Sequence, residues 1–188
     1  MNPLPVRRPG WLAAAAPSWS PLQKYWLLRP GALTAGLRRL GAVRLEVLRE
    51  YAEGLRPDEA ACLTRPVRSP VWVREIVMSI DGVDSVAARS LTPLPASHGV
   101  WQGMRRLRAR PLADMLYHDP RVTRSAFSVA RLHWPMPFHA LASRVQARHG
   151  AAPPAPLLAR RSVFWRAGQP LVVAECFLPA FWHIATEA

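Results

Sequence analysis

Residues 71–91 read VWVREIVMSI, then Asp81-Gly82, then VDSVAARSL. The first ten residues are rich in β-branched side chains, and Asp-Gly is a favoured two-residue turn between antiparallel strands. This stretch therefore predicts a β-hairpin. Side chains alternate along a strand, so Arg74 shares one face with Trp72 and Ile76. The hairpin thus places a guanidinium on an apolar surface.

A second hairpin is predicted near the C-terminus, with a turn at Ala167-Gly168-Gln169 between strands over 161–166 and 171–178. Glu175 lies in its second strand, within the run PLVVAECFLP, where the neighbouring side chains are apolar. An unpartnered buried charge is costly, so this carboxylate needs a partner, and Arg74 is the candidate. The pair would suit a small ligand with a carboxylate at one end and a hydroxyl at the other. The alternative is a salt bridge that only organises the sheet, because buried ion pairs are commonly structural.

Short helices are predicted in two pairs, and each pair is broken at an Arg-Pro sequence. The first pair covers residues 21–28 and 33–40, and the second covers residues 98–110 and 111–116. Composition predicts a strand over 121–132 and a helix over 138–148. Periodicity leaves residues 42–53 open to helix or strand, and we favour a strand. Antiparallel hairpins combined with short helices predict an α+β fold with a single antiparallel sheet.

The length of 188 residues predicts one domain. Residues 1–20 are expected to form a loosely ordered N-terminal arm, and residues 21–188 a single domain with an insertion at about 133–159. The sequence has no apolar run of the roughly 20 residues that a transmembrane helix needs, and the N-terminus lacks a convincing cleavage region for a secretory signal. We therefore expect a cytoplasmic protein. We also expect a monomer.

The chain is strongly basic, with 25 Lys and Arg against 12 Asp and Glu and a formal net charge of +13. The basic residues are scattered rather than clustered, which favours a solvated basic surface over a specific nucleic-acid site. The positive charge supports an anionic ligand but does not select one. The six histidines show no metal-ligand spacing, the two cysteines form no Cys-x-x-Cys motif, and neither a Gly-x-Ser-x-Gly motif nor a Gly-rich phosphate loop is visible. Metal, hydrolase and nucleotide chemistry therefore have no support in the sequence.

Several motifs are arranged as in a known family. The blocks are Trp72-Val73-Arg74-Glu75-Ile76 with Asp81-Gly82, Arg110-Pro111-Leu112, Arg160-Arg161-Ser162 continuing to Gly168-Gln169-Pro170-Leu171 and Glu175-Cys176-Phe177-Leu178-Pro179, and a weaker block from Trp26 to Thr34. In order and spacing they resemble the chorismate pyruvate-lyases (chorismate lyases) of ubiquinone biosynthesis. The resemblance spans residues 22–179.

The resemblance implies a lyase without a cofactor that converts chorismate to 4-hydroxybenzoate and pyruvate. It also implies that the ligand is enclosed between the sheet and two helix-turn-helix flaps. By position, Arg74 matches the arginine that holds a ligand carboxylate, and Glu175 matches the glutamate at the hydroxyl end, so these two are the expected catalytic residues. Leu112 matches a ligand-contacting leucine on one flap, and Leu33 stands where a member of the family has a methionine on the other flap. Arg89 is expected to supply a second positive charge for the pyruvyl carboxylate.

Two other functions remain open at this point. The effector-binding domains of some bacterial transcription regulators (the UTRA type) resemble the same fold without catalysis, so a non-catalytic binding module is the main alternative. These domains normally follow a DNA-binding domain, for which residues 1–20 are expected to be too short. The third hypothesis is a basic nucleic-acid-binding protein, which would show strongly salt-dependent retention of DNA or RNA.

Overall fold

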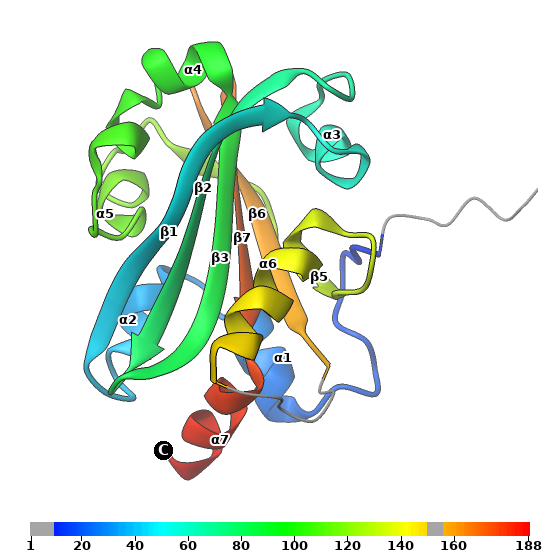
Figure 1. Ribbon diagram of the computed structural model, residues 1–188, viewed down its shortest axis with the longest axis vertical. Helices are drawn as coiled ribbons and strands as arrows, with labels where there is room; N and C mark the ends of the chain where they lie inside the picture. Colours follow the sequence, from blue (N-terminus) through cyan, green and yellow to red (C-terminus); the bar gives the residue numbers. More distant parts are fainter. Residues whose placement is uncertain (1–9, 150–155) are drawn as a thin grey trace, which may run out of the picture.

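A seven-stranded antiparallel sheet forms the centre of the molecule (Figure 1), as a computed structural model that describes residues 10–149 and 156–188 shows. The strands are β1 (Val43–Gly54), β2 (Pro70–Ile80), β3 (Val83–Pro93), β4 (Thr123–Arg124), β5 (Ser128–Arg131), β6 (Leu158–Arg166) and β7 (Gln169–Phe177). Their order is β1-β2-β3-β7-β6-β4, and β5 also pairs with β6. The predicted α+β fold with a single antiparallel sheet is confirmed.

Both predicted hairpins are present, and their turns explain the choice of residues. Asp81 and Gly82 have φ of 49° and 85°, and Ala167 and Gly168 have φ of 46° and 70°. A two-residue turn with positive φ at both positions matches the twist of the strands on either side, and glycine adopts it without strain. The Asp81 carboxylate also accepts a hydrogen bond from the amide of Ala42 at 2.8 Å, which ties the β2–β3 turn to the start of β1.

The helices form two flaps on one face of the sheet, with α2 and α5 on the same side in Figure 1. The first flap consists of α1 (Pro21–Leu28) and α2 (Leu33–Leu37), and the second of α4 (Leu94–His98), the 3₁₀ helix η1 (Gln102–Arg106) and α5 (Ala113–Leu116). The hydroxyl of Tyr117 donates to the carbonyl of Gly31 at 3.0 Å, so the two flaps touch. The expected helix over 98–110 is wrong, because α4 stops at His98 before Gly99 and the chain continues as a 3₁₀ turn.

The opposite face of the sheet is covered by α6 (Pro137–Gln146), which precedes the short 3₁₀ helix η2 (Ala147–His149). Phe138, Leu141 and Val145 of α6 pack with residues of β2, β3 and β7, including Val77 and Cys176. The helix expected over 138–148 is therefore present. It lies in the segment that we expected as an insertion, of which residues 150–155 fall outside the described part of the chain.

The N-terminal segment is packed against the domain from residue 10 onward. Leu12 pairs with Val129 of β5, and Trp19 is buried in the cluster that contains Trp26 and Phe181. The expected loose arm over 1–20 therefore does not describe residues 10–20, and residues 1–9 lie outside the described part. Within residues 10–149 and 156–188, none of the helices combines the length and apolar character that a membrane-spanning segment requires.

Three further elements were not predicted correctly. The sequence analysis did not predict helix α3 (Pro57–Leu63), which lies between β1 and β2, or helix α7 (Pro179–Glu187), which follows the last strand. The strand expected over 121–132 is split into β4 and β5. Ser125 lies between them and bonds the backbone of Val163 on β6, since its amide donates to the Val163 carbonyl and its Oγ accepts from the Val163 amide, both at 2.9 Å.

The start of α1 is fixed by a capping box, and this allows a first prediction. Oγ of Ser20 accepts from the amide of Gln23 at 3.1 Å, and the Ser20 amide donates to Oε1 of Gln23 at 3.0 Å. We expect Ser20→Ala to lower the free energy of unfolding by about 1 kcal/mol, because the amide of Gln23 at the helix start loses its acceptor. Urea denaturation of this variant beside Ser20→Thr, which keeps the hydroxyl, measures the effect. Equal losses in both variants would contradict a capping role.

Candidate active site

A cavity lies between the sheet and the two flaps. Its floor is formed by the sheet and its roof by the flaps. The floor residues are Leu45, Ile76, Met78, Ala88, Ser90, Arg160, Ser162, Phe164, Val173 and Glu175. The roof residues include Leu33 and Thr34 from the first flap and Leu112, Leu116 and Tyr117 from the second. The cavity is therefore largely apolar, as small-molecule sites usually are.

One end of this cavity is polar because Glu175 and Arg160 meet there. They are directly opposite each other on β7 and β6, and Nε of Arg160 donates to Oε2 of Glu175 at 2.6 Å. Nη1 of Arg160 also donates to the carbonyls of Trp26 and Arg29, at 3.2 and 3.0 Å. These carbonyls lie at the C-terminal end of α1, where backbone acceptors lack partners within the helix. Arg160 therefore joins Glu175 to the first flap.

Arg74 lies on the same face of the sheet as Glu175. It is paired with Ser90, while Ile76 is paired with Ala88, and Ala88 with Glu175. Two strand spacings of about 4.8 Å and one two-residue step of about 6.7 Å put the Cα atoms of Arg74 and Glu175 about 12 Å apart. The two side chains thus flank an apolar floor from different ends.

The guanidinium of Arg74 is held by groups other than Glu175. Nη1 donates to Oε1 of Glu50 at 2.6 Å, and Nη2 donates to the backbone carbonyls of Arg108 and Arg110 in the second flap. Arg74 lies beside the cavity without lining it. A direct Arg74–Glu175 salt bridge, the structural alternative considered above, is therefore not formed. Of the other expected contacts, Leu33, Leu112 and Glu175 do line the cavity.

Arg89 is the one expected site residue that lies on the wrong face. Its neighbours Ala88 and Ser90 line the cavity, so Arg89 projects from the opposite side of the sheet. Counting outward from the Asp81-Gly82 turn would place Arg89 opposite Arg74. A register shift between Met78 and Ser79 adds one residue to β3, so that Arg74 pairs with Ser90 instead. A one-residue shift moves every later side chain to the other face, so the expected contact with the pyruvyl carboxylate does not fit this structure.

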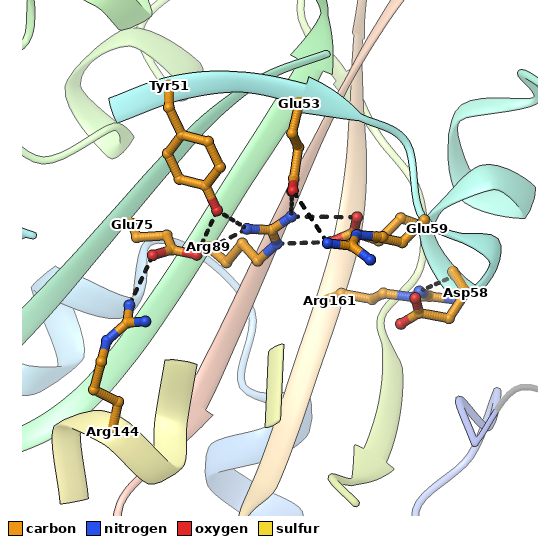
Figure 2. Close-up of polar contacts among 9 residues, drawn as sticks. Tyr51, Glu53, Asp58, Glu59, Glu75, Arg89, Arg144 and Arg161 are labelled. Carbon is orange, nitrogen blue, oxygen red and sulfur yellow. Dashed lines mark hydrogen bonds and ion pairs between the residues drawn. The ribbon is translucent and has the colours of Figure 1, made fainter. Parts of the chain in front are cut away.

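Carboxylates surround Arg89 on that opposite face, as Figure 2 shows. Its contacts are Glu59 at 2.7 Å, Glu75 at 2.8 Å, the Tyr51 hydroxyl at 3.0 Å, and Glu53. The Arg89 side chain is only 2% exposed, so these partners compensate a buried charge. Burial raises the pKa of the Glu59 carboxyl, although the charge of Arg89 acts in the opposite direction. We therefore interpret the role of Arg89 as structural.

The sequence analysis did not identify Arg160 as a site residue, although the spacing from the hairpin turn indicates it. The β6–β7 hairpin has no register shift, so counting outward from Ala167-Gly168 pairs Arg166 with Gln169 and Arg160 with Glu175. The same alternation sends Arg161 to the other face, where Nη1 donates to the carbonyl of Asp58 at 2.9 Å. The consecutive residues Arg160 and Arg161 thus project from opposite faces of the sheet.

Comparison with solved structures defines the fold class. The effector domain of PhnF from Mycobacterium smegmatis matches with a TM-score of 0.53 and 17% identity, over 80% of this chain and 90% of that domain. The ligand-binding domain of a putative GntR-family transcriptional regulator from Bordetella bronchiseptica matches with a TM-score of 0.51 and 13% identity, over 73% of this chain and 86% of that one. At these identities the likeness concerns the fold alone: the chain shares the fold of these two regulator domains.

Sequence comparison then identifies the family. The model of the family described as "Chorismate lyase" matches residues 6–186. A probable chorismate pyruvate-lyase from Bordetella pertussis is 66% identical over 185 residues, which are 98% of this chain and 95% of that protein. Probable chorismate pyruvate-lyase 1 from Pseudomonas entomophila is 38% identical over 94% of this chain and 93% of that protein. This chain belongs to the chorismate lyase family, as the motif blocks predicted.

Proposed function

We propose that this protein removes pyruvate from chorismate and releases 4-hydroxybenzoate, without a cofactor, as a cytoplasmic step towards ubiquinone. The observation that supports this most is the placement of Arg74 and Glu175 at different ends of one apolar floor, beneath two flaps. The family assignment supplies the substrate, and this geometry supplies a site of the matching shape and polarity. We further propose that the protein acts as a monomer and uses no nucleic-acid partner.

In this proposal the ring carboxylate of chorismate binds Arg74. The planar guanidinium pairs with a carboxylate through two parallel hydrogen bonds. Glu50 now occupies one side of that guanidinium, and its side chain is 28% exposed, so it can turn to solvent when the substrate carboxylate takes its place. The carbonyls of Arg108 and Arg110 keep Arg74 at the second flap meanwhile. Substrate binding and closure of this flap are thereby connected.

Glu175 accepts a hydrogen bond from the hydroxyl of the substrate at the opposite end of the ring. This contact fixes the rotation of the ring, and Leu33 and Leu112 cover its two sides from the flaps. In the reaction, the ether bond between the ring and the pyruvyl group breaks, and hydrogen leaves the adjacent, hydroxyl-bearing carbon. That hydrogen ends on the methylene carbon of the departing pyruvate, and the ring becomes aromatic. The driving force lies in the substrate, so the protein contributes orientation, charge placement and exclusion of water.

A conservative substitution tests the role of Glu175. We expect Glu175→Gln to lower kcat/KM for chorismate by about tenfold, because a hydrogen bond to a charged acceptor becomes one to a neutral acceptor. The pH–rate profile should keep its shape, since the glutamine keeps an acceptor oxygen at the same position. A loss of more than about a thousandfold, together with a missing limb of the profile, would instead assign proton transfer to Glu175.

The activity itself is tested by incubating the purified protein with chorismate and following both products. Pyruvate is measured by coupling to lactate dehydrogenase, and 4-hydroxybenzoate is separated by chromatography. We expect equal amounts of the two. If neither product forms while 4-hydroxybenzoate still binds, the chain is a binding module of the same fold. If 3-hydroxybenzoate forms, the proposed orientation of the ring is wrong.

A further inference from the structure

We propose that Arg160 binds the second carboxylate of chorismate, the one on the pyruvyl side chain. This inference rests on the proposed function and replaces the expected role of Arg89. In this role Arg160 contacts the substrate directly, at the polar end of the cavity. Three independent observations support it: the position of Arg160, the charge around the cavity, and the donors that Arg160 has left.

The position follows from the register of the last hairpin. Arg160 lies directly opposite Glu175, at 2.6 Å between Nε and Oε2, and both line the cavity. In chorismate the carbon with the hydroxyl and the carbon with the pyruvyl ether are neighbours. A substrate whose hydroxyl meets Glu175 therefore carries its side chain next to this hydroxyl, within reach of the guanidinium of Arg160.

The charge of the substrate requires a second cation. Chorismate is a dianion, and Arg74 is proposed to neutralise one carboxylate only. Arg89 is separated from the cavity by the sheet and is already surrounded by carboxylates. Among the described residues that line the cavity, Arg160 is the one with a cationic side chain. Burying a carboxylate here without Arg160 would leave it unpaired, which is strongly unfavourable.

The donors of Arg160 are only partly used. Nε donates to Glu175, and Nη1 donates to the carbonyls of Trp26 and Arg29. Nη2 has no hydrogen-bond partner among residues 10–149 and 156–188, so its two N–H groups are available to a ligand. The ring of Phe127 lies 4.4 Å from the guanidinium carbon and supports its plane. The guanidinium of Arg160 is thus held through Nε and Nη1 before the substrate binds, so binding costs little side-chain conformational entropy.

This role predicts a difference between two ligands, because 4-hydroxybenzoate has no pyruvyl group. The second ligand is a stable aromatic analogue, 4-hydroxybenzoate with a 1-carboxyvinyloxy group at the 3-position. In Arg160→Lys the ammonium group can keep one contact with Glu175, but it has no equivalent of the Nη2 donors that would bind the ligand carboxylate. By calorimetry, we expect this variant to bind the analogue about 10- to 100-fold more weakly and 4-hydroxybenzoate no more than about threefold more weakly. Its kcat/KM for chorismate should fall with the affinity for the analogue.

Arg161→Lys is the matched control. Arg161 is the next residue on β6, is nearly as buried, and faces the other side, where it contacts the carbonyl of Asp58 and the ring of Trp11. We expect it to bind both ligands like the unmodified protein. If Arg160→Lys weakens both ligands equally, Arg160 only positions Glu175 and the first flap, and the inference is overturned.

A measurement on the unmodified protein makes the test independent of how the variant folds. The carboxyvinyl group of the analogue is replaced by its carboxamide, which has the same shape without the charge. We expect at least tenfold weaker binding of the amide, and equal binding of acid and amide would overturn the role of Arg160. These outcomes are distinct from a failure of the proposed function, which would appear as absent turnover of chorismate by the unmodified protein.

Discussion

Replacing Arg74 by alanine is expected to lower kcat/KM for chorismate by about 100- to 1000-fold. The variant loses two charge-assisted hydrogen bonds to the ring carboxylate, which together are worth about 3–4 kcal/mol. The affinity for 4-hydroxybenzoate should fall by a similar factor, because the product keeps this carboxylate. The fold should survive, since the partner Glu50 is partly exposed and can be hydrated when Arg74 is absent.

Steady-state kinetics and calorimetric titration with 4-hydroxybenzoate measure this effect, and urea denaturation checks the fold. Arg74→Lys is the informative comparison: it keeps the positive charge but not the planar fork, so we expect an intermediate loss of about tenfold. If Arg74→Ala turned chorismate over at a near-normal rate, the ring carboxylate would have to bind elsewhere. The proposed orientation would then be lost as well.

The second large effect concerns stability rather than activity. We expect Arg89→Met to lower the free energy of unfolding by about 3–5 kcal/mol, because the buried carboxylates of Glu59 and Glu75 and the half-buried carboxylate of Glu53 lose their shared cation. The folded fraction should keep its kcat/KM for chorismate within about threefold, since Arg89 lies across the sheet from the cavity. Urea denaturation and steady-state kinetics together test both statements.

A variant at the edge of the same network provides the control. Arg144 donates to Oε2 of Glu75 at 3.0 Å, but its side chain is 51% exposed. Arg144→Met should therefore cost no more than about 1 kcal/mol. A fall of 100-fold or more in kcat/KM for Arg89→Met at unchanged stability would put Arg89 into the substrate site after all.

The stability penalty of Arg89→Met should also depend on pH. Burial already raises the pKa of the Glu59 carboxyl, and removing Arg89 removes the charge that opposes this rise. A group with a raised pKa binds its proton more tightly in the folded state than in the unfolded state, so folding is favoured as pH falls through the folded pKa. The difference in unfolding free energy between variant and unmodified protein should accordingly shrink from pH 8 towards pH 5. A penalty that grows on acidification would contradict this.

The two hairpins show why one side of the site could be predicted from the sequence and the other could not. In the last hairpin the two-residue turn is followed by an uninterrupted register, so simple counting places Arg160 opposite Glu175. In the first hairpin the register shifts between Met78 and Ser79, and counting puts Arg89 on the wrong face. The local sequence does not indicate this register shift. Ser85, the additional residue, is accommodated by tertiary contacts, including a hydrogen bond from the amide of Leu178 to the Ser85 carbonyl at 2.9 Å.

The flaps show a similar division. The positions of the Arg-Pro breaks predicted where each flap turns, because proline restricts its predecessor. The type of helix was not predictable in the second flap, where Gly99 ends α4 and the chain continues as a 3₁₀ turn. The partner of Arg74 was also hidden, since Glu50 lies on a strand that pairs with β2 across a β-bulge near Leu48. Such pairings depend on the whole sheet.

A crystal structure of the protein with 4-hydroxybenzoate tests the central claim most directly. We predict that the ring lies between the sheet and the two flaps, with its carboxylate about 3 Å from the guanidinium of Arg74 and its hydroxyl within hydrogen-bonding distance of Glu175. A product molecule bound on the other side of the sheet, or one with its carboxylate beside Arg160 and its hydroxyl at Arg74, would contradict this assignment.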